Sequence, residues 1–308
     1  IGVVAAEIKP GMQIDIERGW FFEGGLGYAI SRLNPWILAP EQYAAGLQRL
    51  KQVVHSGGHT TIGDLATGMF NLTAEAEALS QHLEGDDVPF RTRLVAHGTV
   101  LTKGSVPPQR GPELAEALLQ RNSHRLHFGR HIKLFSDGAF FSQLAQLQAP
   151  GYIDGHHGEW LSTPEILEQH IRSYWYAGYQ IHVHVTGDLG LQLTLDILQK
   201  MQEEKPRFNH GFTLEHFGFS TPEQIRQIKA LGAQVSANVY YLHELSDSYT
   251  QSGIGYERAS QMARLGSCFK AGINTTVHSD FTMAPAEPLN SMWAVSYTHL
   301  TLPTIFRV

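Results

Sequence analysis

The fold is decided by four strand-like segments, which read HIKLFSD (131–137), QIHVHV (180–185), GFTLEH (211–216) and NTTVHSD (274–280). They are short runs of mainly apolar and β-branched residues, which is typical of buried strands. Helix-like stretches lie between or beside them, at 163–177, 189–203, 221–230 and 258–271. Because strands that alternate with helices pair in parallel, this pattern predicts an α/β fold.

Further segments extend the alternation. Strands are predicted at 59–66, 90–98 and 234–240, and a helix at 40–55. No glycine-rich dinucleotide-binding turn follows any predicted strand, which disfavours an open doubly wound sheet. Polar residues instead recur where the strands end, as they do on the catalytic face of a barrel. The sequence therefore predicts a TIM-type (β/α)8 barrel.

The spacing of these polar residues assigns them to barrel strands. One unit of such a barrel takes about 31 residues. One unit separates His184 from His216, and two units separate His216 from Asp280. If Lys133 ends the fourth strand, the other three end strands five, six and eight. The first strand then lies before residue 1 or takes an atypical form within the first 40 residues, so we expect the barrel to be incomplete.

The residue types at these positions suit a hydrolytic metal centre. Two neutral imidazoles and a carboxylate can hold Zn²⁺ or a similar divalent ion, in one or two copies, and leave a position open for water. Water bound to such an ion loses a proton near neutral pH and can attack a carbonyl carbon. Asp280 is placed to ligate the metal and to act as general base. Lys133 fits as a ligand only if it is carboxylated, and otherwise serves as a charge partner.

Composition excludes several other classes. The 308 residues are 42% hydrophobic and 17% charged, with a net charge of −6, which is unlike a disordered chain or a basic nucleic-acid scaffold. No uninterrupted apolar stretch reaches about 18 residues, so we expect no membrane span. The single cysteine, Cys268, excludes an internal disulfide framework and fits a cytoplasmic protein. The 17 histidines direct attention to metal binding.

The quoted motifs resemble the metal-dependent amidohydrolase superfamily, and most closely its amidohydrolase-3, YtcJ-like branch. The similarity rests on Lys133 in IKLFSDG, His184 in VHVTGD, His216 in LEHF and Asp280 in HSDFTMAP. The segment GHTTIGD (58–64) also resembles the second strand of that branch. The similarity extends over residues 15–295 and carries the four motifs in the same order.

The resemblance implies hydrolysis of an amide or related non-peptide C–N bond in a small molecule. It makes Lys133, His184, His216 and Asp280 the metal ligands, with Lys133 carboxylated and bridging. The family also carries an H-x-H ligand pair on its first strand, whereas the only such pair here is 182–184. We therefore expect the first strand and a flanking small β domain to be missing, with 1–295 a partial barrel and 296–308 a non-native-looking tail.

Neighbouring residues receive narrower predictions. Asp137, Tyr240 and His97 are candidates for substrate contact near the catalytic rim. Strand alternation turns Glu215 to the side opposite His216, where it is predicted to be structural. His182 is expected inside the barrel, where it packs in the core or supports a metal ligand, and His278 is expected in the barrel interior.

Two alternatives remain open. A catalytically silent barrel fragment could bind a ligand or a partner without turnover. A barrel enzyme could act on a phosphoester, but no Lys/Arg cluster of the kind that phosphate attracts stands near the strand ends. We expect no nucleic-acid or membrane partner, and leave assembly into a homo-oligomer open.

Overall fold

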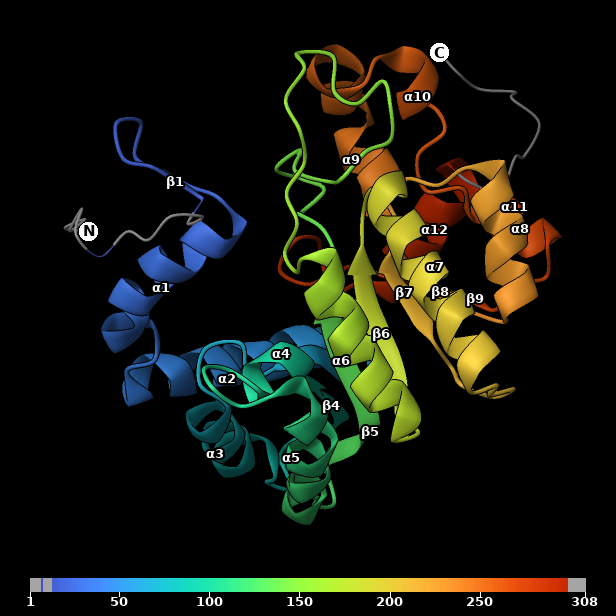
Figure 1. Cartoon of the computed structure of the whole chain (residues 1–308). Coiled ribbons are helices and arrows are strands. Elements are labelled where there is room, and N and C mark those ends of the chain that lie inside the picture. Colours follow the sequence, from blue (N-terminus) through green and yellow to red (C-terminus); the bar gives the residue numbers. More distant parts are fainter. Residues whose placement is uncertain (1–6, 8–12, 299–308) are drawn as a thin grey trace.

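The protein, in a computed structural model that describes residue 7 and residues 13–298, is an α/β fold around a curved parallel sheet (Figure 1). Seven strands follow one another in chain order and pair only with their sequence neighbours. They are β3 (Thr61–Thr67), β4 (Arg91–His97), β5 (Leu126–Phe135), β6 (Gln180–Val185), β7 (Thr213–His216), β8 (Gln234–Asn238) and β9 (Thr275–His278). This is the strand order of an incomplete TIM-type barrel.

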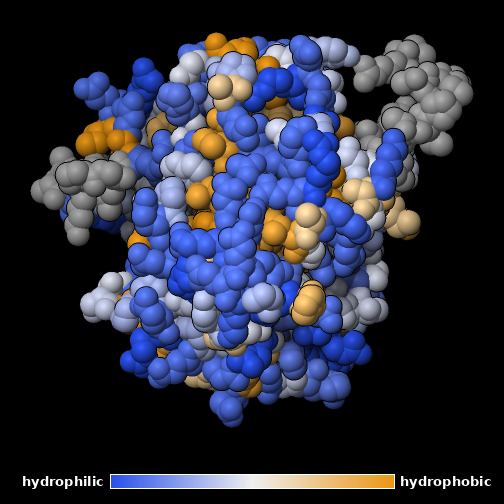
Figure 2. Space-filling model, turned by 45° about the vertical axis from the view of Figure 1, so that its right-hand side comes forward, coloured by the Kyte–Doolittle hydropathy of each residue, from blue (hydrophilic) through white to orange (hydrophobic). Residues whose placement is uncertain are grey.

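Helices pack around the outside of the sheet (Figure 1). The main ones are α2 (Pro40–Ser56), α3 (Leu72–Leu83), α5 (Gly111–Leu118), α6 (Pro164–Tyr176), α7 (Asp188–Glu204), α8 (Pro222–Leu231) and α11 (Leu265–Lys270). The remaining elements are a two-stranded pair β1 (Ile14–Asp15) and β2 (Trp20–Phe21), α1 (Glu23–Ile37), α4 (Gly98–Leu101), short turns at Pro108–Arg110, Leu119–Arg121 and Tyr249–Gly253, α9 (Tyr240–Ser248), α10 (Tyr256–Ala259) and α12 (Pro288–Thr298). The face of the molecule in Figure 2 is mainly hydrophilic, with small separate hydrophobic areas.

The central strands are buried on both faces, which is why they read as nearly continuous apolar runs. Ile181, Val183 and Leu214 have no exposed surface. The helix before β6 covers them with Tyr174 and Trp175, which are equally buried. This aromatic pair therefore belongs to the core.

All seven predicted strands are confirmed to within a few residues. The helix predicted at 258–271 is wrong, because α10 ends at Ala259 and α11 begins at Leu265. Between them Ala263 adopts a positive φ of 46° and donates its N–H to the carbonyl of Gly218, 2.8 Å away. This bond ties the chain to the loop after β7 and interrupts the helix.

Within the described chain, β3 and β9 are the two edges of the sheet. The segment after β9 crosses toward the other edge, where Nε2 of His59 lies 3.1 Å from the carbonyl oxygen of Ala286. Gly57 passes so close that a Cβ atom would lie 2.2 Å from that same oxygen. The two edges are thus linked by loop contacts rather than by a strand pair.

The last predicted segment, 296–308, falls largely outside the described residues. Its first three residues continue α12, which ends at Thr298. None of the helices in the described ranges is long and apolar enough to cross a membrane.

Candidate active site

Four polar side chains converge at the carboxyl end of the sheet, as the strand spacing predicted. Lys133 lies near the end of β5, His184 near the end of β6 and His216 at the end of β7, while Asp280 follows β9 by two residues. Lys133 Nζ is 3.3 Å from His216 Nε2. The rings of His184 and His216 have centroids 4.5 Å apart, and His216 Nδ1 is 3.5 Å from Asp280 Oδ2. One imidazole thus contacts all three other groups.

Burial keeps the two imidazoles of this cluster neutral and also lowers the pKa of its lysine. Desolvation, reinforced by the charge of Lys133, lowers the pKa of His184 to about 3. The same causes hold the pKa of His216 well below its usual value. The pKa of Lys133 is also lowered by burial, against the opposing charges of Glu215 and Asp280. Neutral imidazoles are the form of histidine that binds metals.

One ring nitrogen of His184, Nε2, is buried and makes no hydrogen bond within the described chain. Backbone bonds with Gly138 and Asp137 act on the same ring and raise its pKa slightly against desolvation. A buried nitrogen left unpaired costs free energy unless a ligand takes it up, so His184 has the free lone pair that a cation needs.

His216 and Asp280 both sit in left-handed backbone conformations. Their φ angles are 72° and 54°, and Phe217 follows at 54°. Positive φ values at residues other than glycine cluster at functional sites, where the surrounding structure holds them. Here they turn both side chains toward the same point at the end of the sheet.

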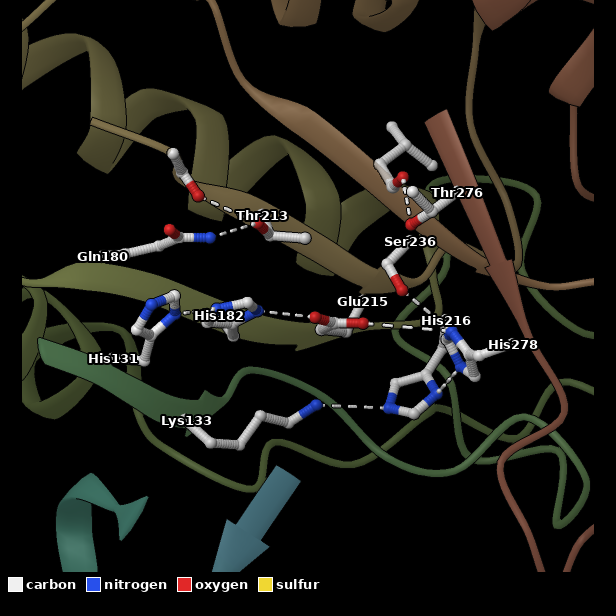
Figure 3. A network of polar contacts seen from close by, with 12 residues as sticks. His131, Lys133, Gln180, His182, Thr213, Glu215, His216, Ser236, Thr276 and His278 are labelled. Carbon is white, nitrogen blue, oxygen red and sulfur yellow. Dashed lines mark hydrogen bonds and ion pairs between the residues drawn. The ribbon is translucent and has the colours of Figure 1, made fainter. Parts of the chain in front are cut away.

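A row of polar contacts runs along the inside of the strands toward His216 (Figure 3). His131 Nδ1 lies 3.1 Å from His182 Nε2, and His182 Nδ1 lies 2.7 Å from Glu215 Oε1. His278 follows, with Nδ1 3.9 Å from Glu215 Oε2 and Nε2 3.2 Å from His216 Nδ1. Burial raises the pKa of Glu215, but the bond to His182 and the charge of Lys133 outweigh it and bring the pKa to about 2.

The prediction that Glu215 faces away from the site is wrong. Strict strand alternation would separate it from His216. The positive φ of His216 breaks that alternation, so both consecutive side chains lie inside the sheet. His278 does lie in the interior, but it contacts His216 directly rather than only packing.

Asp137 does not face the site, contrary to its prediction as a substrate contact. It is completely buried, and its carboxylate accepts hydrogen bonds from the backbone N–H groups of Thr186 (3.0 Å), Gly187 (2.7 Å) and Gln146 (2.9 Å). Its oxygens are therefore committed to shaping the loops after β5 and β6.

His97 lies beside the site rather than in it. Its partner in the β4–β5 register is Lys133, and its Nδ1 is 2.9 Å from the hydroxyl of Thr99. The ring of Phe135 stands next to both His97 (4.8 Å) and His184 (5.5 Å). Burial lowers the pKa of His97 to about 4.

Tyr240 lies at the carboxyl end of the sheet, next to the cluster. It is 1% exposed and, with Asp280, lines a cleft of about 790 Å³ at this end of the sheet. Its hydroxyl has no hydrogen-bond partner in the part of the chain that the structure describes.

The cluster is not a finished coordination site. Over residue 7 and residues 13–298, no three His, Cys, Asp or Glu side chains approach one point closely enough to hold a metal ion. His216 explains this in part, because Nε2 faces Lys133 and Nδ1 faces both His278 and Asp280.

These buried polar side chains lie at the carboxyl end of a curved parallel sheet, which is where barrel enzymes carry their active sites. The model of the amidohydrolase family, amidohydrolase-3, matches residues 23–305, so the chain belongs to that family. No curated protein matches the sequence.

Solved structures share the fold. An uncharacterized metal-dependent hydrolase from Pyrococcus furiosus has a TM-score of 0.71 at 22% identity, over 96% of this chain and 58% of that one. One from Pyrococcus horikoshii OT3 has a TM-score of 0.70 at 19% identity, over 94% and 56%. Ochratoxinase from A. niger has a TM-score of 0.54 at 16% identity, over 86% of this chain and 62% of that one. The chain thus spans less than two thirds of each of these proteins.

Proposed function

We propose that this chain carries the core of a metal-dependent hydrolase that cleaves an amide or related non-peptide C–N bond in a small molecule. The observation that carries the proposal is the buried, neutral pair His184 and His216 between Lys133 and Asp280, at the end of the sheet where barrel enzymes act. Membership of the amidohydrolase family supports it.

The residues fit a divalent cation in donor chemistry. His184 offers a buried nitrogen without a partner, His216 a second neutral imidazole and Asp280 a carboxylate. Zn²⁺ suits this mixed nitrogen and oxygen set. When bound, such an ion supplies Lewis acidity at a carbonyl oxygen and lowers the pKa of water.

Asp280 has the role of general base in this proposal. Its side chain is 43% exposed, so water and substrate can reach it. A carboxylate oxygen takes a proton from the attacking water as the C–O bond forms, and returns it to the nitrogen as the C–N bond breaks. His216, 3.5 Å away, orients the carboxylate.

Lys133 has two candidate roles. Desolvation lowers its pKa and so increases the share of neutral amine, which is the form that reacts with CO₂ to give a carboxylated ligand. Left unmodified, it donates a hydrogen bond to His216 and offsets the charge of Asp280.

The remaining parts of the proposal rest on resemblance. We place the protein in the YtcJ-like branch and propose that an H-x-H pair on a strand outside this sequence completes the ligand set. The proposal includes a cytoplasmic location, no nucleic-acid or membrane partner and an assembly that is open to homo-oligomers.

A catalytically silent chain is the second candidate. The observation that favours it is the lack of a three-ligand cluster within the described ranges. A silent chain binds no divalent ion tightly at His216, whereas an enzyme core does.

The two candidates are separated by metal analysis of purified protein, followed by zinc titration calorimetry. We expect His216→Ala to abolish the bound ion, and His124→Ala, which removes an exposed histidine, to retain it. Equal zinc content in both variants contradicts the proposed site. Absence of zinc also from a longer chain that contains an H-x-H strand favours the silent reading.

A further inference from the structure

We propose that the cleft beside Asp280 selects substrates with an aromatic or similarly flat apolar group that is neutral or cationic, and that Glu244 sets this charge preference. This inference deepens the proposed function. The claim that the bound molecule is a substrate rests on that function, whereas the claim that the cleft binds such molecules does not.

Three separate segments build the cleft at the carboxyl end of the sheet. Phe141 comes from the loop after β5, Tyr240 and Glu244 from α9 after β8, and Phe281 from the segment after β9. In a barrel, these are the loops that determine which substrate reaches the catalytic residues. The cleft of about 790 Å³ includes Asp280 in its wall, so a molecule bound there lies beside the proposed general base.

The walls of the cleft are aromatic and open to water. Phe141 is 63% exposed and Phe281 is 47% exposed, which is unusual for two large apolar rings facing one cleft. Exposed aromatic surface of this kind gains stability when a flat apolar group covers it. The volume is ample for one ring with substituents.

The charge of the cleft is negative. Its charged lining residues are Glu244 and Asp280, and no lysine or arginine from the described chain lines it. Lys133 faces Asp280 from inside the sheet and offsets that charge. Among the residues that the structure describes, the ion-pair partner of Glu244 is His243, whose Nε2 lies 3.5 Å from Glu244 Oε1, and the side chain of Glu244 is 59% exposed. An anionic group entering the cleft therefore meets Glu244 without a compensating cation, while a cationic group gains from it.

The experiment uses three probes of one shape that cannot be hydrolysed at a C–N amide bond: benzamidine (cationic), acetophenone (neutral) and benzoate (anionic). Binding is measured by ligand-observed NMR titration of the whole chain in the presence of a chelator, so that a bound ion does not attract benzoate. We expect benzamidine to bind about three- to fivefold more tightly than benzoate, a modest ratio because Glu244 is partly solvated.

Two variants separate the contributions of charge and ring. Glu244→Gln removes the preference for benzamidine over benzoate, while Phe141→Ala weakens all three probes alike and keeps the ratio. Glu77→Gln, which removes an exposed carboxylate on α3, is the matched control and changes nothing.

The proposal is overturned if no probe binds, if benzoate binds as tightly as benzamidine, or if Glu244→Gln leaves the ratio unchanged. These results do not depend on zinc or turnover. If the chain discriminates between the probes but binds no zinc at His216, the proposed hydrolase function is contradicted and the proposed binding cleft is supported.

Discussion

The loops after β5 and β9 each place an aspartate two residues beyond the strand, Asp137 and Asp280 respectively. Asp137 is completely buried, and three backbone N–H groups from neighbouring loops donate to it. Asp280 keeps 43% of its side chain exposed, lies 3.5 Å from an imidazole and lines the cleft. A carboxylate at a strand end is free for chemistry only where backbone donors have not already used its oxygens.

The comparison also explains how this end of the molecule is held together. The bonds to Asp137 join the loop after β5 to the loop after β6, close to His184. Asp137 therefore holds the two loops together, whereas Asp280 stays accessible for the role proposed for it. The predictions below test this division.

The largest effect is expected from Asp280→Asn. If Asp280 moves the proton, the substitution lowers the rate of amide hydrolysis about 10²- to 10⁴-fold, while the melting temperature changes little because the side chain is half open to water. Steady-state kinetics on a panel of small amides, together with thermal unfolding, measures both. A drop in melting temperature as large as that of an Asp137 variant would erase the difference between the two loops.

Asp137→Asn is expected to act on stability. An amide keeps one acceptor oxygen and turns an NH₂ group toward backbone donors, so the free energy of unfolding at about pH 8 falls by roughly 3 kcal/mol. Urea denaturation measures the change. Asp86→Asn, which alters an exposed aspartate, is the control and stays within about 0.5 kcal/mol.

Asp137 and the buried histidines His97 and His184 are expected to respond to pH with opposite signs. Burial raises the pKa of Asp137 to about 7 even though backbone N–H bonds lower it, so the folded form binds the proton more tightly than the unfolded chain. Its contribution to stability falls as pH rises from about 4 to about 7. Burial instead lowers the pKa of His97 and of His184, to about 4 and about 3, so their contribution is lost as pH falls from about 6.5 toward these values.

Unfolding free energies between about pH 4 and pH 8 separate the two contributions. In wild type, the histidines make the free energy of unfolding fall as pH drops below about 6.5. His97→Asn should reduce this fall by up to about 3 kcal/mol between about pH 6.5 and pH 4. Asp137→Asn should make the same fall in unfolding free energy steeper, because it removes a group that stabilises the fold at low pH. Changes in the reverse directions would show that burial does not control these pKa values.

The smallest effect is expected from Tyr240→Phe in the cleft. The hydroxyl of Tyr240 has no partner in the described part of the chain, so its loss changes the free energy of unfolding by less than about 1 kcal/mol. Tyr249→Phe is the matched control, since that buried hydroxyl donates to the carbonyl of Phe140 and its loss should cost more. Urea denaturation measures both changes. If the two variants lose the same free energy of unfolding, the hydroxyl of Tyr240 does make a hydrogen bond and the prediction is wrong.

Much of the site could be predicted from the sequence because strand ends in a parallel barrel meet at one rim. Residues one or two units apart, such as His184, His216 and Asp280, must then lie close together. Glu215 was placed wrongly because alternation along a strand assumes extended backbone, which His216 abandons. The break after Ala259 was missed because the bond that causes it comes from a loop far away in the sequence.

The sequence alone determined the seven strands, their parallel order and the rim that holds Lys133 and the two histidines, because apolar periodicity and repeat length are local properties of the chain. Only the tertiary structure decided which polar groups keep free atoms. Asp137 accepts hydrogen bonds from backbone N–H groups of its own loop and of the loop after β6, whereas Nε2 of His184 has no hydrogen-bond partner in the described chain. Hydrogen-bond satisfaction depends on which groups arrive from elsewhere in the fold, and no local pattern records that.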